Sequence, residues 1–151
     1  MRISAKADYA VRAALELAAS TGEPVKGEYL AEAQGIPLQF LEHILLELKH
    51  ARLIQARRGA KGGYWLAQPP EEVTLANVIR AVEGPLANIQ DQAPEQTKYA
   101  GNAEQLSEVW IAVRASLRRV LENVTIADLR DGKIPSDVLE LTQDEGAWVT
   151  R

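Results

Sequence analysis

Three cations stand close together in the chain, namely Arg57, Arg58 and Lys61, and they are followed by Gly62 and Gly63. Guanidinium and ammonium groups bind the phosphates of nucleic acids, and arginine also suits the narrow minor groove of DNA. Glycine accepts positive φ angles, so the segment can turn sharply and protrude from a fold. The pattern predicts a basic loop for a phosphate-lined groove, with Lys61 as a phosphate contact.

A second group of side chains suited to DNA lies just upstream, in residues 37–50. An apolar stripe recurs there at helical spacing and consists of Leu41, Ile44, Leu45 and Leu48. The stripe leaves Gln39, Phe40, Glu42 and His43 free. In the major groove glutamine can bond to adenine, glutamate can accept from cytosine, and an aromatic ring can contact a thymine methyl group. An exposed polar helix face is usually only solvated, so the basic loop that follows it is what favours DNA binding.

The elements that must hold these side chains form a helix-turn-helix. Ser4 is the expected N-cap of a first helix that ends before Gly22, and a second helix over 27–34 should bury Tyr29, Leu30 and Ala33. Gly35 suits the left-handed residue after that helix, and a third helix should run from about residue 37 to 50. Short apolar runs at 53–57 and 64–67 should pair as strands on either side of the basic loop.

The two strands and the basic loop between them form a wing. Beyond this wing, Thr74 should cap a helix from Leu75 to about Glu83, followed by a long loop over 85–101. A helix over about 102–123 should follow, and then a short one from Thr125 to near Gly132. The long helix has an apolar seam with spacings of four and three, made of Leu106, Trp110, Val113, Leu117, Val120 and Val124. About 30 Å of helix exceeds what the small domain needs, so the seam predicts a dimer, with packing inside a monomer as the alternative.

The expected fold is mainly α, a winged helix-turn-helix domain with a two-stranded wing and a long C-terminal dimerisation helix. We divide the chain into a DNA-binding domain (1–84), a loop (85–101), the dimerisation helix with the short helix after it (102–132) and a tail (133–151) to which no structure is assigned.

The net charge of −4 conceals an uneven distribution. Residues 1–68 hold nine Lys and Arg against seven Asp and Glu, a balance of +2, while residues 69–151 hold eight against fourteen, a balance of −6. DNA affinity would therefore depend on local cations. No apolar run approaches the roughly 18 residues that a membrane span needs, and a cytoplasmic location is expected.

Enzymatic and metal-binding functions find little support. The chain has no cysteine, which excludes thiolate catalysis and cysteine-ligated metals. The two histidines, His43 and His50, lie about 10.5 Å apart along one expected helix, too far to chelate one ion. The basic loop lacks the spacing of a nucleotide-binding P-loop, and no nucleophile motif appears. We expect no enzyme activity, no cofactor and no metal.

Spaced motifs in this sequence resemble the Rrf2 family of bacterial winged-helix transcription regulators, which includes iron–sulfur cluster regulators. The matching residues are Tyr9-Ala10-Val11, Gly35-Ile36-Pro37, Phe40-Leu41-Glu42, Arg58-Gly59, Gly62-Gly63-Tyr64 and Glu83-Gly84. The similarity extends from about residue 1 to residue 132 and includes Trp110 and Thr125.

The resemblance implies a homodimer on a palindromic operator, with each recognition helix in a major groove and each wing in a minor groove. It makes Gln39, Phe40, Glu42 and His43 base or backbone contacts and Arg58 the minor-groove arginine. It also implies phosphate contacts from Lys6 and Tyr9, and a wing shaped by Gly62 and Gly63.

One departure from the family limits what the resemblance implies. Cluster-binding members carry three cysteines in the loop before the long helix, and residues 91–103 of this chain contain none. Carboxylates alone do not hold an iron–sulfur core, so a cysteine-ligated cluster is excluded. An alternative therefore stays open: a winged-helix module that senses a small-molecule effector or binds a protein, with only weak DNA binding.

Overall fold

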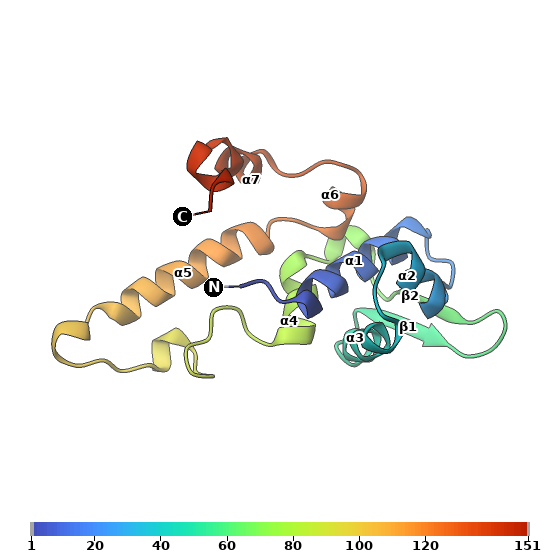
Figure 1. The fold of residues 1–151 in the computed structure, drawn as a ribbon, viewed down its shortest axis with the longest axis horizontal. Coiled ribbons are helices and arrows are strands. Elements are labelled where there is room, and N and C mark those ends of the chain that lie inside the picture. Colours follow the sequence, from blue (N-terminus) through green and yellow to red (C-terminus); the bar gives the residue numbers. More distant parts are fainter. Residues whose placement is uncertain (1, 151) are drawn as a thin grey trace.

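The computed structural model describes residues 2–150 and shows a mainly helical chain with one two-stranded antiparallel sheet (Figure 1). This confirms the winged helix-turn-helix fold. None of the helices in the described part could span a membrane. The elements are α1 (Ala5–Ala19), α2 (Gly27–Gln34), α3 (Leu38–His50), β1 (Ile54–Arg57), β2 (Gly63–Leu66), α4 (Leu75–Glu83), α5 (Leu106–Leu121), α6 (Ile126–Arg130) and α7 (Ser136–Glu140).

The core forms around α1, which packs against α3, α4 and α6. Its small side chains, mostly alanines, allow the neighbouring helices to approach closely, and larger apolar groups from those helices fill the space between them. The fully buried large side chains include Leu17, Leu30, Leu41, Ile44, Leu45, Leu48, Ile54 and Ile126. The predicted stripe of α3 is therefore confirmed as core.

The burial predicted for α2 is wrong at two positions. Leu30 is buried, but Tyr29 is 59% exposed and Ala33 is also exposed. A helix turns by about 100° per residue. The core-facing side of this short helix runs through Gly27, Leu30 and Ala31, so Tyr29 and Ala33 lie on the other side of it.

The predicted helix ends are confirmed by their caps. Ser4 Oγ accepts a hydrogen bond from the Ala7 N–H at 3.0 Å, and Gly35 ends α2 in the left-handed region at φ 62°. Thr74 and Thr125 both form capping boxes, in which the side chain three residues later bonds back to the cap. Local signals therefore set where these helices begin and end.

The wing is hydrogen-bonded to the segment before α2. Its two strands pair in a register that joins Ile54 to Leu66 and Arg57 to Gly63. Val25 and Tyr64 exchange two backbone hydrogen bonds of 2.8 Å, so the segment before α2 lies along β2. Gly63 adopts φ 148°, and a Cβ there would lie 2.6 Å from the Val25 carbonyl oxygen. This close approach requires glycine.

The long helix α5 is shorter than predicted and ends before Val124. Residues 101–103 form a separate 3-10 turn, and the helix spans Leu106–Leu121. Val124 is only 3% exposed, and its carbonyl accepts a hydrogen bond from the Leu75 N–H at 3.0 Å. Its assignment to the dimer seam is therefore wrong, because the chain turns after α5 and places Val124 in the core.

The loop over 85–101 is attached to α5. It contains a short 3-10 helix, η2 (Pro94–Gln96), whose Pro94 is buried. Arg114 Nη1 of α5 lies 2.6 Å from Glu95 Oε2. A hydrogen bond from its own backbone, and then the Arg114 guanidinium, hold the pKa of Glu95 below its ordinary value.

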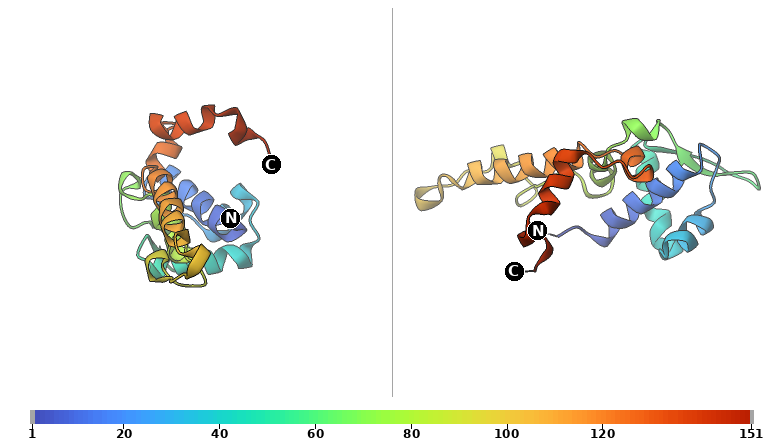
Figure 2. Two further views of the ribbon diagram at one scale, coloured as in Figure 1. Left: turned by 90° about the vertical axis from the view of Figure 1, so that its left-hand side faces the viewer. Right: turned by 90° about the horizontal axis from the view of Figure 1, so that it is seen from above.

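The tail is more ordered than the sequence suggests. After α6 it forms α7 and two 3-10 turns, tied back through the amide of Asn123 bonded to Asp137. The segment stands away from the other helices in Figure 2. Its helical turns are held by hydrogen bonds within the segment, including one from Trp148 Nε1 to the Thr142 carbonyl.

The wing geometry predicts unequal effects of two glycine substitutions. Gly59 has φ 104° with open space around its Cβ position, so Gly59→Ala should lower the free energy of unfolding by about 1–2 kcal/mol. Gly63→Ala adds overlap with the Val25 backbone and should cost about 1–3 kcal/mol more. Urea unfolding measures both losses of stability, and equal losses would contradict the close approach of Gly63 to the Val25 backbone.

The Glu95–Arg114 ion pair predicts a shifted titration. Because the pKa of Glu95 is lower in the folded protein, its carboxylate stabilises the contact between the loop and α5 at pH values above the pKa of Glu95 in the unfolded chain. This stabilisation is lost as the pH falls through the pKa of Glu95 in the folded protein. Arg114→Met should raise the pKa of Glu95 part of the way toward the ordinary value of a glutamate, while Lys98→Met should leave it unchanged. Carbon NMR of the Glu95 carboxyl checks this, and identical midpoints in wild type and Arg114→Met would contradict it.

Candidate nucleic-acid interface

The exposed face of α3 carries the side chains that the sequence assigns to base reading. Gln39, Glu42 and His43 are exposed, and Phe40 is 40% exposed. The Phe40 ring meets Tyr9 of α1 edge to face, with centroids 5.7 Å apart. Phe40 is therefore held in place by α1 while part of its ring stays at the surface.

The predicted phosphate contacts on α1 lie beside α3 but are engaged within the protein. Lys6 Nζ donates to Glu47 Oε1 at 2.8 Å. The other oxygen, Glu47 Oε2, is buried and has no hydrogen-bond partner among residues 2–150, so the Lys6 ammonium is its main neutralising group. Tyr9 lies between Phe40 and the Arg12 guanidinium, which is 5.2 Å from its ring centroid. A phosphate contact from Lys6 would have to share the ammonium with Glu47.

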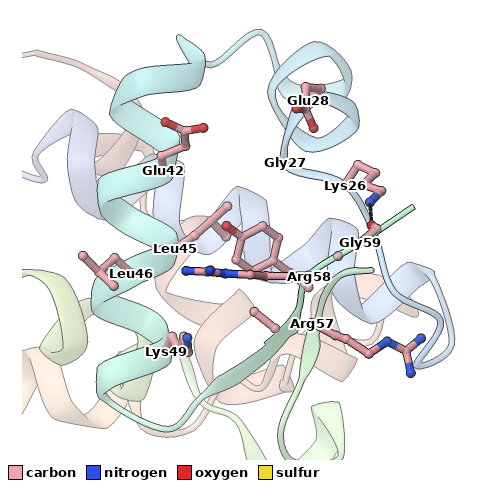
Figure 3. A pocket seen from close by; sticks show the side chains of 13 residues that line it. Lys26, Gly27, Glu28, Glu42, Leu45, Leu46, Lys49, Arg57, Arg58 and Gly59 are labelled. Carbon is pink, nitrogen blue, oxygen red and sulfur yellow. Dashed lines mark hydrogen bonds between the residues drawn. The ribbon is translucent and has the colours of Figure 1, made fainter. Parts of the chain in front are cut away.

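A cleft of about 520 Å³ lies between α3 and the wing, and the start of α2 forms its third wall. Figure 3 shows the Arg58 side chain reaching across this cleft toward α3, whereas Arg57 points away from it. Arg57 Nη2 donates to the Lys61 carbonyl at 3.1 Å and so braces the wing turn. Lys61 and Gly59 are exposed on the same turn.

The cleft brings together residues that the sequence assigned to DNA and others that it did not. Glu42, Arg58 and Gly63 line it, as do Lys26 and Lys49, which sequence reasoning missed. Lys26 Nζ donates to the Gly59 carbonyl and joins the start of α2 to the wing turn (Figure 3). A count of the cations directly before α2 and in the last turn of α3 would have identified both lysines as candidates.

The apolar seam of α5 is only partly covered by its own chain. No residue of this helix is buried, and five predicted seam residues are half-buried: Leu106, Trp110, Val113, Leu117 and Val120. Beside them Val109 is 51% exposed, and Ala112 and Ser116 are exposed on the same side of the helix. The free face of α5 therefore includes Val109, Ala112 and Ser116, and the exposed side continues around the helix through Ile111 and Ala115.

The side chains of the 85–101 loop do not fit an iron–sulfur cluster. Such a cluster is held mainly by thiolates, and the chain has none. Glu95 is engaged by Arg114, and within residues 2–150 no three His, Asp or Glu side chains gather as a metal site. No step of the function is therefore assigned to iron.

Comparisons with known proteins agree with this geometry. The Rrf2 family model, described as "Iron-dependent Transcriptional regulator", matches residues 3–132. A Mycobacterium tuberculosis protein named "Putative HTH-type transcriptional regulator Rv1287" is 48% identical over 145 residues, covering 95% of this chain and 90% of the relative. The HTH-type transcriptional regulator CymR of Bacillus subtilis is 32% identical over 130 residues, covering 85% of this chain and 89% of CymR.

Solved structures show the same fold. The structure of CymR, titled the global cysteine regulator of B. subtilis, has a TM-score of 0.72 at 29% identity and covers 87% of this chain and 97% of CymR. The IscR structure from T. potens has a TM-score of 0.68 at 29% identity and covers 100% of this chain and 93% of IscR. The fold, the exposed helix beside a basic wing and the match over residues 3–132 lead to one conclusion: the chain belongs to the Rrf2 family of winged helix-turn-helix, DNA-binding transcriptional regulators.

Proposed function

We propose that this protein binds a palindromic DNA operator as a homodimer and regulates transcription in the bacterial cytoplasm, without enzymatic activity. The observation that carries the proposal is the arrangement of α3 and the wing, which lie at the end of the molecule opposite the projecting part of α5 (Figures 1 and 2). One end can then face DNA while the other faces a second copy.

The exposed N-terminal half of α3 supports reading in the major groove. Gln39 offers a donor and an acceptor, and Glu42 offers an acceptor, for base edges. The wing, which carries Arg58, is hydrogen-bonded to Val25 and Lys26. In the free protein Arg58 lies across the cleft, so entry into a minor groove requires its side chain to swing outward.

The free face of α5 supports pairing with a second copy. Helices in proteins owe most of their stability to the packing of an apolar face. This helix has 16 residues and no buried side chain in the single chain. Pairing across Val109, Ala112 and Ser116 would cover its apolar side, and the small side chains at 112 and 116 would let two helices approach closely. A two-fold pair would present two recognition helices to two half-sites.

Arg58→Ala should weaken operator binding by about 1–3 kcal/mol while fold and dimer stay intact, because a desolvated guanidinium contact with DNA is removed. Fluorescence anisotropy with the operator duplex measures this, and Lys133→Ala, which removes a cation outside the interface, is the matched control. Unchanged affinity in the Arg58 variant would remove the wing from the mechanism.

Val109→Asp should convert the dimer to a monomer, because it would place a charge in the paired apolar face. Val109 is exposed in the single chain, so the substitution should not disturb the fold. Ile111→Asp, about 160° around the same helix from Val109, should remain dimeric. Light scattering coupled to size exclusion distinguishes the two, and a dimeric Val109 variant would place the interface elsewhere.

A further inference from the structure

The cleft lies between α3 and the wing, the two elements that are proposed to enter neighbouring grooves of DNA. In a B-form duplex a single sugar–phosphate strand separates each major groove from the adjacent minor groove. If α3 enters the major groove and the wing enters the minor groove, that strand has to pass between them. The cleft lined by Lys26, Lys49 and Arg58 lies at this position (Figure 3).

The charges of the cleft suit a phosphate chain. Of the sixteen Lys and Arg in residues 2–150, six form ion pairs, and six of the other ten lie between Lys26 and Lys61. Within that range Lys26 and Lys49 line the cleft, and neither forms an ion pair with a carboxylate of the described residues. Two carboxylates, Glu28 and Glu42, also line it, against three cations, Lys26, Lys49 and Arg58, because the Arg57 side chain points away from the cleft. The balance favours an anion.

The apolar part of the cleft suits a sugar. Leu46 is 48% exposed although it belongs to α3, and it lines the cleft together with the half-buried Tyr64. An apolar surface between cations matches the alternation of deoxyribose and phosphate along one strand. This match accounts for an exposed leucine beside the recognition face.

We propose that this cleft is a binding site for the sugar–phosphate strand between the two grooves, which extends the proposed DNA-binding function. Lys49 of α3 and Lys26 before α2 contact its phosphates from opposite walls, and Leu46 packs on a deoxyribose. Arg58 leaves its place across the cleft as the strand enters. This site contacts sugar and phosphate but no base, so it carries no sequence specificity. It fixes the position of the duplex for the side chains that contact bases.

The test combines one protein substitution with one neutral linkage in the DNA. A specific duplex is first obtained with the wild-type protein, and its phosphates are then replaced one at a time by methylphosphonate. In the wild type, one linkage per half-site between the major-groove and minor-groove contacts should weaken binding about tenfold when neutralised. In Lys49→Met the same replacement should have almost no further effect.

The melting temperature and the salt dependence of binding distinguish the loss of a phosphate contact from the loss of the fold. Lys49 is exposed, so Lys49→Met should retain the melting temperature. The slope of the logarithm of affinity against the logarithm of salt concentration should become shallower by about 0.9 for each phosphate that Lys49 neutralises in the wild type. Lys26→Met should behave in the same way at a neighbouring linkage, whereas the control Lys133→Met should keep every wild-type penalty.

Failure of the cleft and failure of the proposed function are distinguishable. A wild-type protein that binds no specific duplex would overturn the proposed function. A wild-type protein that binds specifically, with the same methylphosphonate penalties in Lys49→Met as in Lys133→Met, would overturn the cleft site alone.

Discussion

Burial of one side of α3 is the constraint on which the rest of the structure depends. Leu41, Ile44, Leu45 and Leu48 are each no more than 1% exposed, and burying such a side chain contributes about 1.5–3 kcal/mol. A surface ion pair contributes about 0–1 kcal/mol, so Lys6–Glu47 cannot set the rotation of the helix. Once the stripe is buried, Gln39, Glu42 and His43 have to face outward, and the chain leaves the helix directly into the wing.

The capped helix ends and the core stripe of α3 were predictable because they depend on local patterns, whereas the predicted length of α5 was too great. Caps at Ser4, Thr74 and Thr125 and the left-handed Gly35 act within a few residues of the chain. The errors at Tyr29 and Val124 have a different origin. Which side of a short helix faces the core, and where the chain turns after α5, depend on neighbours that are distant in sequence.

The cleft could not be found from the sequence for the same reason. It joins Lys26, Lys49 and Arg58, and only the pairing of Val25 with Tyr64 brings the first of these to the wing. The loop over 85–101 shows a related limit. The absence of cysteine excluded a thiolate-bound cluster, but the sequence did not reveal that Glu95 and Arg114, with buried Pro94, attach the loop to α5.

The proposed function requires two copies of this chain to bind a symmetric DNA sequence. In vitro selection from random-sequence duplexes tests it most directly, because it assumes neither the operator nor any residue's role. A symmetric dimer should enrich one motif with two-fold symmetry, whose half-sites are separated by about one helical turn or a multiple of it. Selection that enriches no sequence, or only an asymmetric one, would contradict the proposed function.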